Sequence, residues 1–337
     1  EYSYGIAESL NLIAPRIFGG SSHENVGTDS RMYAFMLEQG VPASQAQDFV
    51  SGMPTYWGDQ PIVSAPAYIG AVVFFLAVLA LFIDERKIKY VFLTGALFTL
   101  VLSWGKNFSL LTDFFIEYVP LYDKFRAVSS IQVILELCFP VLAVMGLQSF
   151  FKAKDEPKLQ QKALVQTGVF GLGILVILLI AKSFFHFTGT SDQYFLESYG
   201  PGFVDALKED RMTMYYADLL RSGFLIIVTF VVLWMFVKNK FSQTTTLVVV
   251  GLVMIFDLFF VDKKYVSAKD FVSPVQIAAP FQETQADAQI LKDTSIYRVF
   301  DLQGQLQGRS SYFHKTIGGY SAVRPRRMQQ LYDYQIA

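Results

Sequence analysis

The sequence is poor in charge, cysteine and histidine. Only 17% of its 337 residues are charged, against about 25% in a typical soluble domain, whereas 53% are hydrophobic and the mean hydropathy is +0.36. The single cysteine, Cys138, excludes an intrachain disulfide, and three histidines far apart in the sequence leave no Cys/His cluster for a structural metal. A net charge of −1 gives no general attraction to nucleic acid. This composition is typical of a membrane protein.

Long apolar runs are what the sequence does contain. A helix that crosses the hydrocarbon core of a bilayer needs about 20 mostly apolar residues. The segments that meet or approach this length are residues 66–83, 90–105, 128–151, 164–187, 217–237 and 244–261. We therefore expect an all-α polytopic membrane bundle of about six transmembrane helices with extracytoplasmic loops.

The connections between these segments differ in length and in basic residues. Three short links, at residues 84–89, 152–163 and 238–243, hold nine Lys and Arg, whereas the longer links at 106–127 and 188–216 hold five. Basic residues concentrate on the cytoplasmic side of membrane proteins. The short links are therefore predicted to be cytoplasmic, and the long loops and both flanking regions extracytoplasmic.

The flanking regions give the predicted domain organisation. Residues 1–65 are expected to form an extracytoplasmic loop region, residues 66–262 the six-helix transmembrane region, and residues 263–337 the truncated beginning of an extracytoplasmic soluble α+β domain. Within the last region, residues 295–302 alternate like a strand and residues 282–293 and 324–334 have helical patterns. The chain starts at Glu1 without a signal-peptide pattern and ends without a terminating feature, so we expect an internal fragment of a longer polypeptide.

Three shorter helices are predicted outside the apolar runs. Thr28, Asp29 and Ser30 are good capping residues for one helix, and Pro42 suits the first helical position of another. The link 106–127 mixes many aromatic and aliphatic residues with charges. It fits an amphipathic helix lying in the membrane interface. Such a helix could shape lateral access for a lipid substrate or simply cover the bundle.

Ionisable residues within the apolar runs are costly and are functional hypotheses by default. Glu136 and Asp257 lie in the outer halves of the third and sixth runs, and no such residue lies in the inner halves. This asymmetry predicts a polar cavity that opens outward. The structural alternative is that Glu136, with Gln132 one turn away on the same helix face, takes part in an interhelical hydrogen bond. Asp218 and Arg221 could form an i,i+3 pair.

Two loops carry further candidate residues. The glycine-rich stretch 18–31 includes His23 and Glu24 and could cradle a phosphate, although such a stretch is more often a flexible turn. No cofactor is evident, and a divalent cation would have no visible ligand cluster.

The stretch "MPTYWGDQPIVSAPAYIGAVVFF" at residues 53–75 precedes the first apolar run. Tyr56 and Trp57 suit the headgroup level of a membrane. Asp59 is expected on the same side as Lys106 and Arg126, so this stretch is either a turn into the membrane or part of the rim of a substrate site.

Several longer strings carry a family resemblance. "EYSYGIAESLNLIAPRIFGGSS", "YWGDQPIVSAPAYIGA", "LSWGKNF", "PLYDKFRAVSSIQVILEL" and "SYFHKTIGGYSAVRPRRMQQLYDYQ" occur in this order along nearly the whole chain. With them the sequence resembles the YfhO-type bacterial multi-pass membrane proteins, in the form common among Bacteroidetes. That family in turn resembles the C-type glycosyltransferases.

The resemblance implies an activity and a location. It implies an inverting glycosyltransferase in the bacterial cytoplasmic (inner) membrane, with a polyprenyl-phosphate-linked sugar as donor and a cell-envelope glycan or protein as acceptor. The catalytic aspartate of such enzymes lies in the first extracytoplasmic loop, which is expected upstream of this fragment. The alternatives are a transporter or flippase of lipid-linked substrates and a non-catalytic envelope-assembly protein. The predicted partners are the bilayer, the lipid-linked sugar and the acceptor, and no nucleic acid.

Overall fold

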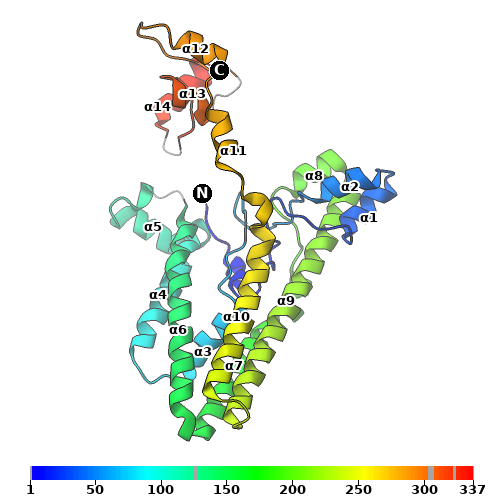
Figure 1. Cartoon of the computed structure of the whole chain (residues 1–337), viewed down its shortest axis with the longest axis vertical. Coiled ribbons are helices and arrows are strands. Elements are labelled where there is room, and N and C mark those ends of the chain that lie inside the picture. The colour runs from blue at the N-terminus through cyan, green and yellow to red at the C-terminus, as the bar shows by residue number, and fades with distance from the viewer. Residues whose placement is uncertain (1, 125–126, 303–306, 322–323, 337) are drawn as a thin grey trace. The chain divides into compact units, whose positions relative to one another are not determined.

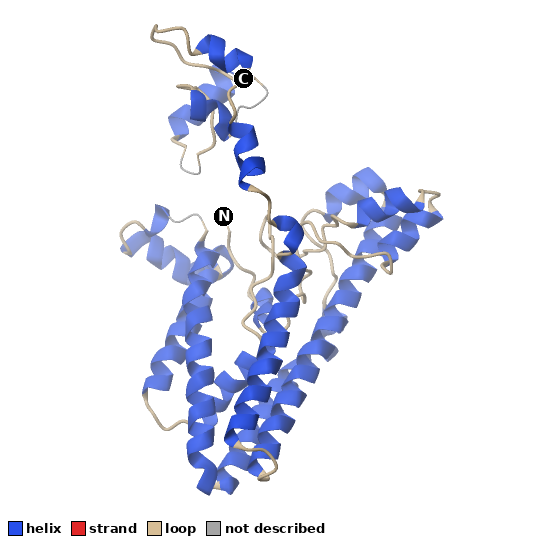
Figure 2. Cartoon of the chain, in the orientation of Figure 1, coloured by secondary structure: helices blue, strands red, loops and turns tan. Residues whose placement is uncertain are grey.

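The computed structural model describes residues 2–124, 127–302, 307–321 and 324–336. Figure 2 shows helices joined by loops and turns, and these residues contain no β-strand. The chain divides into two compact units, Glu1–Tyr265 and Val266–Ala337. Short turns of helix lie before, between and after the longer helices: η1 (Ala7–Leu12), η2 (Gly105–Phe108), η3 (Tyr122–Lys124), η4 (Val128–Ile131), η5 (Ala153–Asp155), η6 (Lys182–Phe184), η7 (Ala268–Asp270), η8 (Ala279–Phe281) and η9 (Tyr332–Ile336).

The first unit is built on long apolar helices, shown side by side in Figure 1. They are α4 (Ile88–Ser103), α6 (Gln132–Lys152), α7 (Pro157–Ala181), α9 (Pro201–Val237) and α10 (Gln243–Tyr265). The last four lie in helical stretches long and apolar enough to cross a membrane. A fifth span results if α4 is counted together with η2 and α5 (Ser109–Tyr118), although the chain bends by 108° between them. Four or five spans, compatible with a multi-pass membrane protein, therefore replace the six predicted.

The first predicted span, 66–83, is helical only as α3 (Ala71–Ile83). Residues 66–70 are not helical, and Gly70 immediately before the helix has a φ of 95°, which disfavours other residues. The 13 residues of α3 extend only about 20 Å, less than the roughly 30 Å of a hydrocarbon core. All of them except Leu81 and Phe82 are buried, against α6, α7, α9 and α10. The apolar run is therefore the core helix of the bundle.

The end of η1 and the irregular chain after it also enter this core from the N-terminal region. Leu12, Ile13 and Phe18 are buried in the same apolar cluster as α3 and α9. The Leu12 carbonyl accepts a hydrogen bond from the Ile69 N–H at 3.3 Å, and the Ile13 carbonyl accepts one from the Ser222 hydroxyl at 2.9 Å. Irregular backbone at membrane depth is stable where protein surrounds it and satisfies its polar groups.

A second apolar core lies beside one end of the bundle. It joins α1 (Arg31–Glu38), α2 (Ala43–Val50), α8 (Asp192–Tyr199) and the first turns of α9. The Ser30 side chain accepts a hydrogen bond from the Tyr33 N–H, which confirms the predicted cap of α1. Pro42 is the residue before α2 instead of its first helical residue. With 37 residues α9 is about 55 Å long, so it reaches beyond the predicted span 217–237 into this second core.

The three short links lie at the opposite end of the bundle. Arg86 of the first link donates to Gln148 near the end of α6 at 2.9 Å, and Phe150 of α6 packs against Phe236 at the end of α9 with ring centroids 6.0 Å apart. Figure 1 shows the α6–α7 and α9–α10 turns together at this end. The basic links thus share one end, and α5, α8 and the second core share the other.

The second unit contains the short helices α11 (Pro274–Ala278), α12 (Gln285–Ile290), α13 (Gly308–Phe313) and α14 (Arg326–Leu331). Two of them confirm the helices predicted within residues 282–293 and 324–334. The predicted strand 295–302, and with it the α+β assignment, is wrong for the residues that the structure describes. Only an isolated bridge joins Val299 to Thr316 there, because no neighbouring strand extends the pairing.

Candidate functional site

Residues 56–60, the sequence Tyr-Trp-Gly-Asp-Gln, form the wall between three cavities at the end of the bundle that holds the long loops. Tyr56 and Gln60 border a cavity of about 510 Å³ on one side and another of about 250 Å³ on the other. Trp57 and Asp59 border a third cavity of about 330 Å³. The stretch singled out in the sequence therefore lies where these cavities approach one another.

Glu8 of η1 is the buried acid of this region. Its side chain borders the second and third cavities, yet the residue is only 1% exposed. The Tyr56 hydroxyl donates to Oε1, and Oε2 accepts from the backbone N–H groups of Gly5 at 2.6 Å and Asp59 at 3.2 Å. Burial raises the pKa of Glu8, against the effect of these three hydrogen bonds, and the nearby Asp59 raises it further. Within the described part of the chain no cation forms an ion pair with Glu8.

Two glycines make room for this carboxyl group. A Cβ at Gly58 would lie 2.0 Å from Glu8 Oε1, and one at Gly5 would lie 2.6 Å from Glu8 Oε2 and 2.8 Å from Asp59 Oδ2. The Gly5 backbone thus approaches both carboxylates. The glycines of "SYGIAE" and "YWGD" are explained by contact with Glu8.

Trp57 faces the protein interior. It is 8% exposed and packs against Phe18, Phe185 and Phe187, with ring centroids 4.4, 5.8 and 5.1 Å away. Its indole Nε1 is buried without a hydrogen-bond partner among the described residues. The ring is therefore not exposed to lipid headgroups as a membrane-interface residue would be, because the N-terminal segment and residues 185–187 cover it.

Arg211 of α9 fixes the backbone beneath this wall. Its guanidinium forms a two-point ion pair with Asp192, at 2.6 and 2.9 Å, and donates to the carbonyl oxygens of residues 54, 55, 56 and 187. Arg211 is only 1% exposed, so its donors are used within the protein. A fully committed guanidinium holds the chain and is not available to a ligand.

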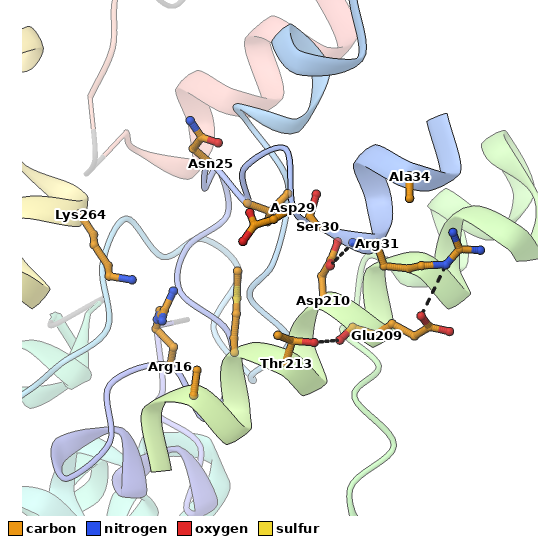
Figure 3. Close-up of a pocket in the computed structure, with 13 residues that line it drawn as sticks. Arg16, Asn25, Asp29, Ser30, Arg31, Ala34, Glu209, Asp210, Thr213 and Lys264 are labelled. Carbon is orange, nitrogen blue, oxygen red and sulfur yellow. Dashed lines mark hydrogen bonds and ion pairs between the residues drawn. The ribbon is translucent and has the colours of Figure 1, made fainter. Parts of the chain in front are cut away.

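A separate charged pocket of about 540 Å³ lies between α1, α9 and the end of α10 (Figure 3). Its charged lining consists of Arg16, Arg31 and Lys264 with Asp29, Glu209 and Asp210. Most of these charges have partners. Arg31 pairs with Glu38 and Glu209, and Asp210 accepts from the first N–H groups of α1 at 2.7 and 2.9 Å.

Arg16 is also occupied. It forms a two-point contact with Asp218, 2.8 and 3.1 Å, and lies 3.5 Å from Glu24. Lys264 has no ion pair among the residues that the structure describes, although Figure 3 shows it reaching toward the same space as Arg16. Because three cations face three acids here, the pocket has no net attraction for an anion.

Asp257 belongs to a cluster at the beginning of α3. Its carboxylate accepts from the Tyr68 hydroxyl at 2.7 Å, from the Val72 N–H at 3.3 Å and from Arg221 at 2.6 Å, and the residue is fully buried. The suggested Asp218–Arg221 pair is not formed, because Arg16 takes Asp218 and Asp257 takes Arg221.

The remaining sequence-predicted residues are dispersed. His23 is exposed and borders the 510 Å³ cavity, whereas Glu24 is buried and accepts from the Thr55 hydroxyl at 2.8 Å. Lys106 is exposed next to Asn107, whose side chain donates to Asp59 at 3.3 Å. Glu136 is exposed on α6, while the neighbouring Gln132 makes the interhelical hydrogen bond, to Ser103 at 3.1 Å. Arg126 lies outside the described residues.

Sequence reasoning missed Glu8, Arg211 and Asp192. Glu8 had a signal, since it is the single charge within the largely apolar stretch "GIAESLNLIA". Arg211 and Asp192 had none, because each is one charge among several and their pairing depends on how α8 and α9 pack.

The described residues contain no group of three or more His, Cys, Asp or Glu side chains that could hold a metal ion. No protein-family model matches the chain, and comparisons with curated proteins and with solved structures also return no match.

Proposed function

We propose that this chain is part of a membrane glycosyltransferase that transfers a sugar from a polyprenyl-phosphate donor to a cell-envelope acceptor. The resemblance in the sequence implies this activity. The observation that supports it best is Glu8, a buried carboxyl group that has no cation partner among the described residues and borders two cavities at the polar end of the bundle. Acids with a raised pKa beside a cavity are candidates for acid–base catalysis.

The proposed reaction is a single displacement. The acceptor oxygen forms a bond to the anomeric carbon while the bond from that carbon to the donor phosphate breaks, and the electron pair leaves with the phosphate. The acceptor proton passes to Glu8, directly or through the Tyr56 hydroxyl that donates to Glu8 Oε1. In this proposal Glu8 takes the role that the resemblance gives to an aspartate upstream of this fragment. Attack from the face opposite the leaving group inverts the anomeric centre.

The leaving phosphate needs positive charge nearby. Lys106 suits this role best because it is exposed, has no ion pair in the described part of the chain, and lies in the same turn, η2, as Asn107, which contacts Asp59. Arg16, Arg31 and Arg211 are neutralised by carboxylates and are better assigned to structure.

The test is sugar transfer from labelled polyprenyl-phosphate donors by the protein in liposomes. Glu8→Gln keeps a side chain of similar size and removes the base, so transfer should fall by about 10²–10⁴-fold. Glu117→Gln, at an exposed position of α5, is the matched control and should retain activity. Because a base must be deprotonated, wild-type transfer should increase as the pH rises through the raised pKa of Glu8, and Glu8→Gln should lose this limb of the profile.

Two results would contradict the proposal. If Glu8→Gln transfers sugar as fast as the wild type, Glu8 is not the base. If folded wild-type protein transfers no sugar from any donor tested, the non-catalytic envelope-assembly alternative replaces the enzyme.

A further inference from the structure

The cavity of about 510 Å³ beside Tyr56, here called the aromatic cavity, differs in chemistry from the charged pocket. It lies where α2, α8 and the beginning of α9 meet the loops around residues 22 and 60. Its volume is within the range of about 300–1,000 Å³ that small-molecule sites occupy.

Aromatic rings form much of its lining. They belong to Phe49, Tyr56, Phe195, Tyr199 and Phe203. Tyr199 is 55% exposed and packs over Phe203 with ring centroids 4.9 Å apart, so one ring remains accessible above a ring in the core. Phe49 also meets Phe203 edge to face at 6.1 Å. The lining thus offers an accessible, supported aromatic surface.

Polar side chains without hydrogen-bond partners among the described residues complete the lining. The side chains of His23, Gln60, Thr190 and Ser191 border the cavity. None of these four makes a side-chain hydrogen bond to another described residue. Together they supply hydroxyl, amide and imidazole groups, which both donate and accept.

The described lining of the cavity has no free charged side chain that could bind an ion. Arg211 is in its lining but is held by Asp192 and by four backbone carbonyls. His23 is the other basic side chain in the lining. A phosphate or carboxylate ligand would therefore find no free permanent cation among the described residues of the lining. An acyl chain would leave four polar side chains without partners, at a cost for each one that is desolvated.

We propose that the aromatic cavity binds a neutral saccharide. Sugar rings present an apolar C–H face to an aromatic ring and hydroxyl groups around the edge, which match the rings and the unoccupied polar groups described above. Tyr56 connects this cavity to the proposed base, since its hydroxyl donates to Glu8. The assignment of the saccharide as the acceptor rests on the proposed function, whereas saccharide binding itself does not.

Binding is tested without a donor, by ligand-observed saturation-transfer NMR on the protein in nanodiscs. The probes are the methyl glycosides of glucose, galactose, mannose and N-acetylglucosamine. At least one glycoside should bind, and Tyr199→Ala should weaken it by about tenfold, as removal of an aromatic contact residue does. Gln60→Ala should also weaken it, without removing an aromatic contact from the second core.

The matched control is Tyr194→Ala. Tyr194 lies on the same helix, is 64% exposed and is not part of the cavity lining, so this variant should bind like the wild type. The proposal is overturned if no glycoside binds, if Tyr199→Ala and Gln60→Ala both bind normally, or if Tyr194→Ala is equally weak. Binding of dodecanoate in place of the glycosides, sensitive to Tyr199→Ala, would assign the cavity to acyl chains. Because no turnover is measured, failure of sugar transfer would leave this result unaffected.

Discussion

At the scale of single residues, Asp257 shows how a charge is accommodated within an apolar bundle. The first N–H groups of a helix lack partners and carry a partial positive charge. The Asp257 carboxylate accepts a hydrogen bond from one of these groups at the start of α3, the Val72 N–H. Tyr68 and Arg221 donate its other hydrogen bonds. The cluster ties α10 and α9 to the first residues of the core helix.

Replacement of Asp257 should therefore destabilise the fold. Asp257→Ala leaves Arg221 without its carboxylate and the α3 terminus without its acceptor. We expect a loss of about 2 kcal/mol, below the roughly 3–5 kcal/mol of a fully buried pair, because the Arg221 side chain is 23% exposed. Denaturant unfolding in detergent micelles measures this loss. Asp262→Ala, at an exposed position of the same helix, is the control, and equal stability of the two variants would contradict the argument.

Residue patterns in the sequence identified part of this chemistry. Asp257 was recognised as a candidate because an acid within an apolar run is energetically costly. Its partner was not predictable, since sequence spacing reports neighbours on one helix, and Asp218 is bound instead by Arg16, 202 positions away. The same limit applies to Glu8, whose partner Tyr56 is 48 positions away in a segment without regular structure.

At the scale of elements, the contact between α3 and α6 depends on a glycine. A Cβ at Gly146 of α6 would lie 2.4 Å from the Leu76 carbonyl oxygen and 2.8 Å from the Ala80 nitrogen. Both atoms belong to helix backbone, so neither can move aside as a flexible side chain would. Small residues allow such close helix packing within membranes.

Gly146→Ala should therefore separate the two helices and cost about 1–3 kcal/mol, the usual range for overpacking. Gly251→Ala on α10 is the matched control, because a Cβ there meets no atom within 4 Å. That change should be neutral or slightly stabilising, since alanine is the better helix former. Thermal unfolding of the purified variants gives the comparison, and a Gly146→Ala protein as stable as the control would show that α6 adjusts freely.

The apolar runs predicted the positions of the long helices well, but they gave the wrong environment for α3 and the wrong start for α9. Hydropathy cannot distinguish a helix surrounded by lipid from one surrounded by protein, and α3 is the second kind. Hydropathy also places the start of α9 at the first apolar residue. The helix in fact continues through polar residues whose other face, with Phe203 and Leu207, forms the second core.

At the scale of the whole first unit, the charge distribution along the bundle is directional. The short basic links share one end, and the candidate cavities lie at the other. Loop lengths and Lys/Arg counts were sufficient to predict this division. The distribution of ionisable residues predicted a polar cavity at this end but not its lining, since Glu136 and Asp257 border none of the cavities described above. The observed linings were not predictable, because they are formed by segments that come together only when residues 2–27, 53–70 and 184–192 pack on the bundle.

The predicted orientation can be measured with an impermeant maleimide on intact cells. In a Cys138→Ala background, Leu196→Cys should react from outside, whereas Lys87→Cys should react only after permeabilisation. Both positions are exposed, and Lys87 is preferable to Arg86, which pairs with the buried Asp84. The reverse pattern would invert the topology and place the cavities at the cytoplasmic surface.

The buried position of α3 has a consequence for how the protein is made. This helix leaves the ribosome before α6, α7, α9 and α10, the helices that later enclose it. Its acceptor at the N-terminal end, Asp257, is synthesised 185 positions after its partner Val72. During synthesis this 13-residue apolar helix must therefore remain at the membrane without its final neighbours. Its packing into the bundle is a late step of assembly. A chain that stops before α10 should retain α6, α7 and α9 around α3 but leave the first turn of α3 without its acceptor, so quality-control proteases should remove it more readily even though every preceding span is complete.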